Sequence, residues 1–167
     1  TRLFDAPRDL VFKTFMDQKH IPRWWGPRGS TTTVDKMDLR PGGVWRFIEH
    51  ARDGVEYGFN GVYREIVPPA RLVYTFEFEG MPGHVLLETV TFEEHNGKTK
   101  MTDHALFESP EDRDGMLQSG MESGARETMD RLEELLSELQ HRAAPSDGEL
   151  VITRLFDAPR ELVWKAW

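Results

Sequence analysis

Two carboxylates, Glu88 and Asp103, are the residues of this sequence best placed for acid–base chemistry. They stand on either side of Asn96-Gly97, a dipeptide that favours a two-residue type I′ turn between antiparallel strands. In the register that this turn sets, the two carboxylates are diagonal neighbours on one face of adjacent strands. The rest of that face is apolar, with the predicted pairs Phe92–Met101, Val90–Asp103 and Glu88–Ala105.

Two carboxylates in one apolar pocket repel each other. The pKa of one should therefore rise, which suits a general acid or base. The alternative is a structural role, in which both carboxylates pair with a buried arginine, and Arg126 on a covering helix is the candidate. Ion-pair networks also perturb pKa values, so both interpretations stay open.

Motifs for other chemistry are missing from the sequence. The six histidines have no spacing typical of a metal site, and the absence of cysteine removes disulfides, thiolate catalysis and zinc–sulfur centres. Gly42-Gly43 lacks the lysine and the helix that a phosphate-binding loop needs. His104 should point outward with no partner to orient it. We therefore expect neither a metal nor a cofactor.

Composition narrows the class of protein. Lys and Arg number 21 against 29 Asp and Glu, so the net charge is −8 over 167 residues, which argues against nucleic-acid and anionic-membrane partners. No apolar run approaches the roughly 20 residues of a membrane span, and the N-terminus does not resemble a signal peptide. These features predict a soluble, cytoplasmic protein.

A repeat defines the domain organisation. Residues 1–15 and 153–167 are identical at eleven of fifteen positions, and a polar segment with Pro145 and Gly148 precedes the second copy. We expect one complete domain over residues 1–140, a linker over 141–149, and the first strand and helix start of a truncated second copy over 150–167. A cut end of a longer chain is the alternative. The amphipathic segment 150–157 is predicted to pair with a sheet edge, in its own chain or in a strand-mediated dimer.

The elements that must position the carboxylates follow from turn and capping signals. A strand stub over residues 1–5 precedes a helix that Asp5 should cap, and a short helix is expected over 18–25. Alternating apolar residues broken by turn signals predict six strands between 31 and 107. One long helix should start at Ser109-Pro110. Its apolar stripe would be Leu117, Met121, Ala125, Met129, Leu132, Leu136 and Leu139.

One face of the predicted sheet carries large aromatic side chains. A three-residue loop, Arg52-Asp53-Gly54, brings the aromatic residues of the flanking strands to the same face, whereas a two-residue turn would separate them. One helix is too narrow to fill this curved surface, so an apolar cavity should remain. Trp25, at the end of the short helix, is either a packing residue or part of the cavity wall. The expected ligand-binding residues are Trp25, Trp45, Phe47, Tyr57, Phe59, Tyr74, Phe76, Glu88, Val90, Asp103, Met121 and Ala125.

Several separated motifs carry a family resemblance. In order they are Asp5-Ala6-Pro7-Arg8, Trp24-Trp25-Gly26-Pro27, Leu39-Arg40-Pro41-Gly42-Gly43, Gly61-Val62-Tyr63 with Val67-Pro68-Pro69, Thr91-Phe92-Glu93-Glu94 and Gly120-Met121. Over residues 1–140 the chain resembles the activator of heat-shock-protein-90 ATPase homologue family, within the START-related (SRPBCC) superfamily. The resemblance implies an α+β helix-grip fold, in which a curved antiparallel sheet of six to seven strands surrounds a long C-terminal helix. Asp103 departs from the apolar strand face usual in such domains.

The resemblance leaves two functions open. The first is a non-enzymatic domain that binds a small hydrophobic ligand or a protein partner such as a chaperone, with a stress-related role. The second is a cyclase, dehydratase or hydrolase that acts on an aromatic or polyketide-like substrate through Glu88 and Asp103.

Overall fold

The computed structural model describes residues 1–143, and the predicted second copy, including the pairing segment 150–157, lies outside this range. The described part contains a seven-stranded sheet and four helices. Their bounds are β1 (Arg2–Phe4), α1 (Arg8–Met16), α2 (Ile21–Trp24), β2 (Thr31–Met37), β3 (Val44–His50), β4 (Glu56–Val67), β5 (Arg71–Phe78), β6 (Val85–His95), β7 (Lys98–Leu106), α3 (Pro110–Gln118) and α4 (Met121–Ala143).

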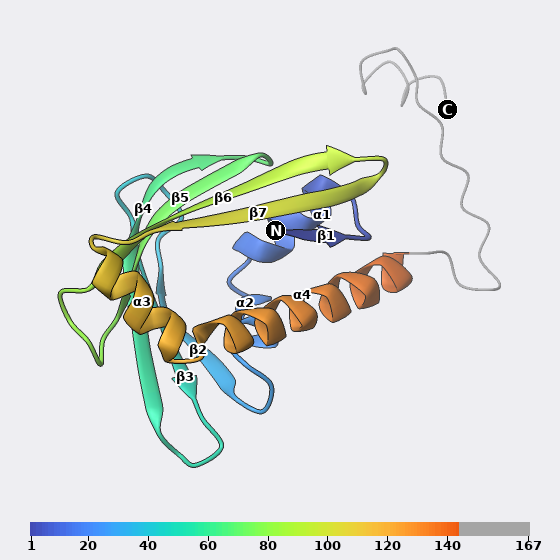
Figure 1. The fold of residues 1–167 in the computed structure, drawn as a ribbon. Helices are drawn as coiled ribbons and strands as arrows, with labels where there is room; N and C mark the ends of the chain where they lie inside the picture. The colour runs from blue at the N-terminus through green and yellow to red at the C-terminus, as the bar shows by residue number, and fades with distance from the viewer. Residues whose placement is uncertain (144–167) are drawn as a thin grey trace, which may run out of the picture.

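The seven strands form one antiparallel sheet in the order β1-β7-β6-β5-β4-β3-β2. The sheet curves strongly, and α4 runs along its concave side (Figure 1). The α+β helix-grip architecture is therefore confirmed. Within the described residues, no helix combines the length and the apolar character that a membrane crossing requires.

The two hairpins that set the registers follow the turn chemistry of the sequence. Asn96 (φ 52°) and Gly97 (φ 78°) form the turn between β6 and β7, and His95 pairs with Lys98. Between β3 and β4, Ala51 N–H donates to the carbonyl of Val55, which leaves a three-residue loop with a left-handed glycine. As a result Phe47 lies opposite Phe59, and the aromatic residues of the two strands share the concave face.

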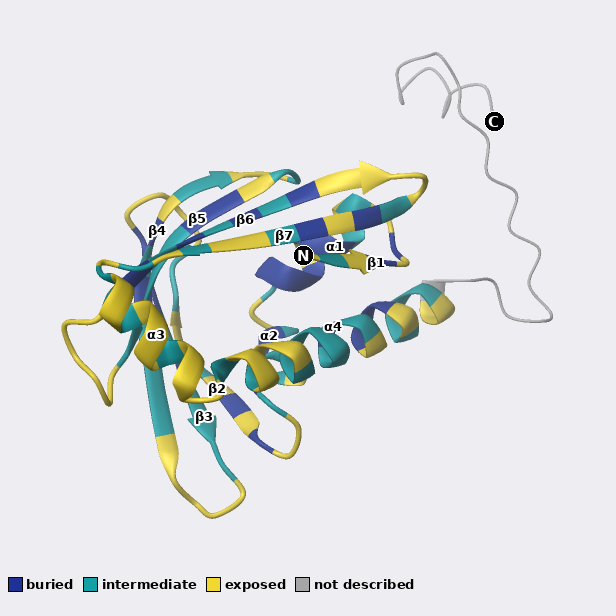
Figure 2. Cartoon of the chain, viewed as in Figure 1, coloured by how far each residue is buried: buried dark blue, intermediate teal, exposed yellow. Residues whose placement is uncertain are grey.

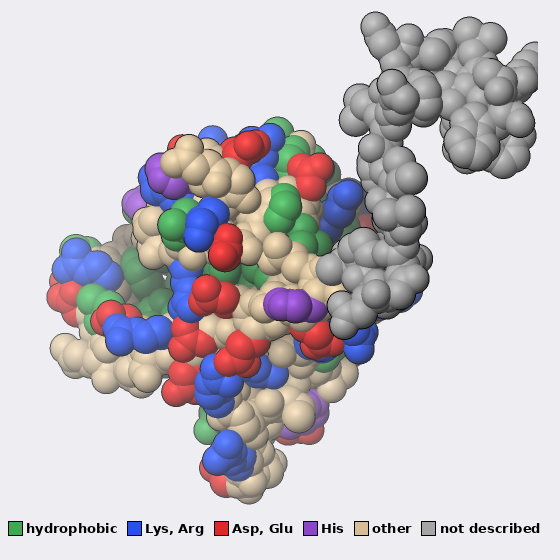
Figure 3. All heavy atoms as spheres, turned by 90° about the vertical axis from the view of Figure 1, so that its right-hand side faces the viewer, with side chains coloured by type: hydrophobic (Ala, Val, Ile, Leu, Met, Phe, Trp, Pro, Cys, Tyr) green, Lys and Arg blue, Asp and Glu red, His purple; other side chains and the backbone are tan. Residues whose placement is uncertain are grey.

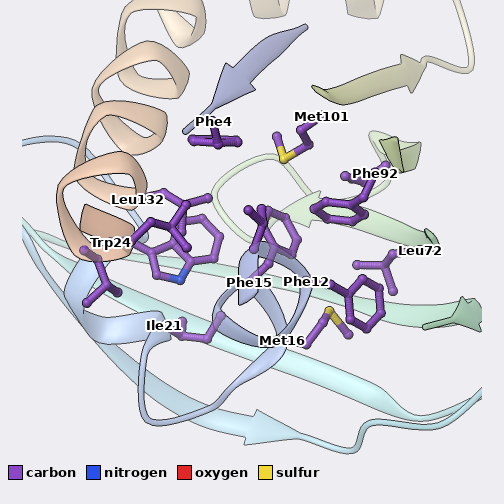
Figure 4. Close-up of a cluster of buried hydrophobic side chains, with 14 of the residues drawn as sticks. Phe4, Phe12, Phe15, Met16, Ile21, Trp24, Leu72, Phe92, Met101 and Leu132 are labelled. Carbon is purple, nitrogen blue, oxygen red and sulfur yellow. The ribbon is translucent and has the colours of Figure 1, made fainter. Parts of the chain in front are cut away.

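One half of that concave face is filled by α1 and α2, which the sequence analysis did not place there. Phe12 and Phe15 of α1 meet Phe92 of β6 edge-on, at 5.4 and 5.6 Å between ring centroids. Trp24 of α2 stacks on Phe15 at 4.9 Å. Figure 4 shows these rings packed with side chains of α4 and the sheet. The expectation that one helix alone covers the sheet is wrong, because two short N-terminal helices also pack against its concave face.

The C-terminal half of α4 closes this packed region. Leu132, Leu135 and Leu136 are all buried, and α4 packs mainly against α1 and α2. Arg131 reaches across to the loop after α2 and donates to the carbonyls of Arg23, Trp25, Gly26 and Pro27 at 2.8–3.2 Å. That side chain fixes α4 to the α2–β2 loop.

The predicted long helix is broken in two. Ser109 caps α3 by accepting from the Asp112 amide, as the sequence indicated. Gly120 then takes a left-handed conformation (φ 83°), which ends α3 and starts α4 in a new direction. The sequence did not reveal this break, because the apolar residues on its two sides, Leu117 and Met121, keep the spacing of one continuous helix.

Two other predicted boundaries are wrong. Pro7, not Asp5, occupies the N-cap position of α1, and no side chain caps that helix. α4 continues to Ala143, so the first three residues of the expected linker 141–149 are helical.

Candidate functional site

The half of the concave face away from α1 carries an open aromatic wall, formed by Tyr57, Phe59, Tyr74, Phe76 and Phe78. All five side chains are only partly buried, although they point to the inner side of the sheet. Phe59 lies 5.5 Å from Phe76 and 5.3 Å from Phe78 between ring centroids. These rings are tilted by 44° and 34° against each other, and they remain partly exposed.

The helices opposite this wall stand away from it. Met121 at the start of α4 is partly buried, and Ala125 is exposed. A Cβ placed on Gly124 would meet no atom within 4 Å. α3 has no buried residue, and both helices are largely exposed in this region (Figure 2). We call the space between the wall and these helices the aromatic cleft.

The surface of the molecule is hollowed. In the space-filling view a depression with hydrophobic side chains inside it lies between the main body and a lobe on the left (Figure 3). A side-chain hydrogen bond joins α3 to the β5–β6 loop: His84 Nδ1 lies 2.7 Å from Asp112 Oδ1.

A small, partly open cavity at the base of the aromatic wall, lined in part by Trp25, Tyr74 and Phe76, is too small for a ligand. Its volume is ≈ 40 Å³, enough for a few ordered water molecules rather than an organic molecule. Trp45 and Phe47, two of the expected ligand-binding residues, lie in its wall and are buried. The wall is completed by Phe15, Met16, Ile21, Trp24, Trp25, Met37, Tyr63, Leu72, Tyr74 and Phe76.

Glu88 projects from β6 into the floor of the aromatic cleft. It pairs with Tyr74 of β5 on one side and Ala105 of β7 on the other, and only 8% of it is exposed. Its Oε2 atom is buried without a hydrogen-bond partner when the carboxyl is ionised. Burial, followed by a hydrogen bond and charge repulsion from Asp103, raises the pKa of Glu88 to about 9. At neutral pH Glu88 therefore carries a proton that it shares with Asp103.

Asp103, on β7, pairs with Val90 of β6. It is therefore the diagonal neighbour of Glu88, as the type I′ turn predicted. Protein surrounds its carboxyl and raises its pKa through desolvation, yet the residue keeps an exposed side. A carboxyl group that is desolvated by neighbouring atoms and still reaches solvent is typical of the wall of an open cleft.

The predicted alternative, in which Glu88 and Asp103 pair with Arg126, is wrong. Arg126 is largely exposed and pairs with Glu122 on its own helix at 3.3 Å. Among the described residues, no arginine or lysine nitrogen lies within salt-bridge distance of a carboxyl oxygen of Glu88 or Asp103. The arginine of α4 that turns inward is instead Arg131, which is partly buried and donates to loop carbonyls.

Tyr74 links the carboxylates to the aromatic wall. Burial first, and then the charges of Asp103 and Glu88, raise the pKa of the Tyr74 hydroxyl well above its usual value. The hydroxyl stays protonated, so it can donate to an acceptor as well as provide a ring face. Its ring also lies 5.8 Å from Trp45 and 6.4 Å from Tyr63 between centroids.

The remaining predicted site residues fall into two groups. Trp25 lies across the wall, 5.0 Å from Phe59 and 5.5 Å from Phe47 between ring centroids, and so borders both the small cavity and the cleft. Val90 is fully buried and belongs to the core, which removes it from the accessible lining. The reason is that α1 covers the region of β6 that contains Val90.

Several lining residues were missing from the predicted set. Phe78 belongs to the open wall, and its alternation with Phe76 was the signal for it. Met37 and the α1 residues of the small cavity depend on the packing of α1 and α2 into the bowl, for which the sequence offered no register. Within the described range, no group of three or more His, Cys, Asp or Glu residues is arranged to hold a metal ion.

The curved sheet, the long C-terminal helix and the apolar concave face define a helix-grip domain. The profile of the family "Activator of Hsp90 ATPase homolog 1-like protein" matches residues 5–137, and the chain belongs to that family.

Solved structures agree with this assignment. A protein from Arthrobacter aurescens is 29% identical, with a TM-score of 0.77 over 82% of this chain and 83% of its own. A Mycobacterium smegmatis protein is 26% identical, with a TM-score of 0.74 over 81% and 86% of the two chains. The AHSA1 protein of Silicibacter pomeroyi, 21% identical with a TM-score of 0.66 over 84% and 95%, shares the fold. No curated protein sequence matches the chain.

Proposed function

We propose that this domain binds a small hydrophobic ligand with an aromatic or similarly flat apolar part in the aromatic cleft. The observation that carries the proposal is the partial burial of five aromatic side chains on the inner face of the sheet. Soluble domains rarely leave a contiguous apolar surface open, and such surfaces mark binding sites. The cavity of ≈ 40 Å³ at the base of the wall is too small for this role, so the ligand would lie between the wall and the start of α4.

The space at Gly124 provides the test. A Gly124→Leu side chain would project into space where a Cβ meets no atom within 4 Å. Naphthylethanol, an uncharged aromatic probe, should bind the wild-type protein in calorimetry and shift the NMR signals of the Tyr74 and Phe76 rings. Gly124→Leu should abolish binding. Ser123→Leu, one position away on an exposed part of the same helix, is the matched control and should bind normally.

Failure of naphthylethanol and of its charged analogues to bind would contradict the proposal. So would binding that Gly124→Leu leaves unchanged, because the ligand would then lie elsewhere.

The carboxyl pair supports a second candidate, an acid–base enzyme of the cyclase, dehydratase or hydrolase type. Glu88, protonated at neutral pH beside an accessible Asp103, is a suitable proton donor at the floor of an aromatic cleft. Turnover of an aromatic polyketide-like substrate that Glu88→Gln and Asp103→Asn both abolish, with binding retained, would support this candidate. Binding without turnover in the wild-type protein would contradict it. The chaperone partner rests on family membership alone and stays a prediction.

A further inference from the structure

The charges around the aromatic cleft have one sign at its floor. Glu88 and Asp103 face the cleft from β6 and β7. The arginines of the covering helices are engaged elsewhere: Arg113 of α3 pairs with Asp114 at 2.7 Å, and Arg126 of α4 pairs with Glu122 at 3.3 Å. Among the described residues no arginine or lysine pairs with the two carboxyls, and the positive groups that act on Asp103 are the N-terminal amino group and His104, so the floor of the cleft favours a cation over an anion.

The hydrogen-bonding capacity of the ionised Glu88 carboxyl is not satisfied by the described residues. It is more than nine-tenths buried, and its Oε2 atom has no donor from any described residue when the carboxyl is ionised. Asp103 is itself a carboxylate and can share a proton with Glu88 but supply none when both are ionised. In the free protein the shared proton satisfies the pair, and the doubly ionised pair would need a donor from outside the described residues.

The wall beside the carboxyls has the complementary property. The face of an aromatic ring attracts a cation, and an ammonium ion next to both rings and a carboxylate gains from both interactions. Tyr74 lies directly opposite Glu88 in the sheet, and the rings of Phe76, Phe59 and Phe78 extend the surface away from the carboxyls. The cleft thus has a charged end and an apolar end.

We propose that the ligand of the aromatic cleft is a hydrophobic amine, with its ammonium group on Glu88 and Asp103 beside the Tyr74 ring and its apolar part along the aromatic wall. This inference rests on the proposed ligand-binding function and names the chemical class of the ligand. Bound ammonium replaces the proton that the two carboxyls share in the free protein. A fatty acid or another hydrophobic anion would face the repulsion of the pair and bind weakly.

Three probes of similar shape test the charge preference: naphthylethylamine, naphthylethanol and naphthylacetate. Their affinities for the full-length chain would be measured by calorimetry at pH 7 and low salt. We expect the amine to bind about tenfold or more tightly than the alcohol, and the acetate to bind most weakly. The Glu88→Gln/Asp103→Asn double variant should lose the preference for the amine and keep the affinity for the alcohol.

Glu93→Gln is the matched control. Glu93 lies on the same strand as Glu88 but is exposed and pairs with Lys100 at 3.1 Å, so its neutral variant should keep the full preference. Equal binding of amine and alcohol, or a preference that survives in the double variant, would overturn the inference and leave the proposed function standing. Binding of none of the three probes would remove the proposed function and the inference with it.

Discussion

The two ends of α4 cover the same sheet in different ways. Toward its C-terminus Leu132, Leu135 and Leu136 are buried against α1 and α2, and Arg131 anchors the helix to a loop. Toward its N-terminus Met121 is only partly buried and Ala125 is exposed. The packed end can therefore hold the fold while the other end stays accessible for the ligand binding that we propose.

The largest effect should come from breaking the packed end. Leu132→Ala removes a side chain that is fully buried, and should lower the free energy of unfolding by about 2–5 kcal/mol through lost burial and a residual cavity. Met121→Ala, the equivalent change at the open end, should lower it by less than about 1 kcal/mol. Urea denaturation measures both values. Equal losses would show that the two ends are packed alike.

Removing the titratable carboxyl of Glu88 should have the next largest effect. Folding raises the pKa of Glu88 from 4.5 to about 9, so the folded state holds the proton more tightly and the wild-type protein loses stability as pH rises through this interval. Glu88→Gln removes this dependence and should be more stable by about 1–3 kcal/mol at pH 8. The gain should vanish near pH 4.5. Denaturation at a series of pH values is the measurement, and a pH-independent gain would contradict the assignment.

Filling the open end should change stability little. Gly124→Leu replaces a helical glycine where the new side chain meets no neighbour at its Cβ, so it should stabilise the protein by up to about 1 kcal/mol through helix propensity alone. The thermal midpoint reports this change. A loss of more than about 1 kcal/mol would mean that the side chain clashes and that the space is not open.

The smallest effect on global stability should come from releasing α3. His84→Ala removes the pairing with Asp112 that links α3 to the β5–β6 loop, and an exposed pair of this kind contributes about 0–1 kcal/mol. Amide hydrogen exchange in residues 110–118 should nevertheless become faster, while exchange in β6 and the C-terminal half of α4 stays unchanged. Unchanged exchange in α3 would show that other contacts hold it.

The sheet and its inner face were predictable because local chemistry fixes them. Asn96-Gly97 and the three-residue loop at Gly54 determine the registers, and the registers determine that Glu88 and Asp103 are neighbours. The break at Gly120 could not be found from the spacing, because Leu117 and Met121 continue one apolar stripe across it.

The surroundings of the carboxyl pair depended on tertiary packing. Arg126 and Arg131 are both arginines on the same helix, and only the rotation of α4 against α2 decides which of them turns inward. The filling of the bowl by α1 and α2 depended in the same way on contacts between distant segments, such as those of Phe12 and Phe15 with Phe92.

The left-handed residue at Gly120 has a consequence for how such domains diverge. Because α3 contributes no buried side chain and joins α4 through a bend, segment 110–118 can change in length or composition without disturbing the frame behind it. Relatives that keep the same scaffold can therefore vary the border of the proposed binding cleft by substitutions in one short stretch of chain.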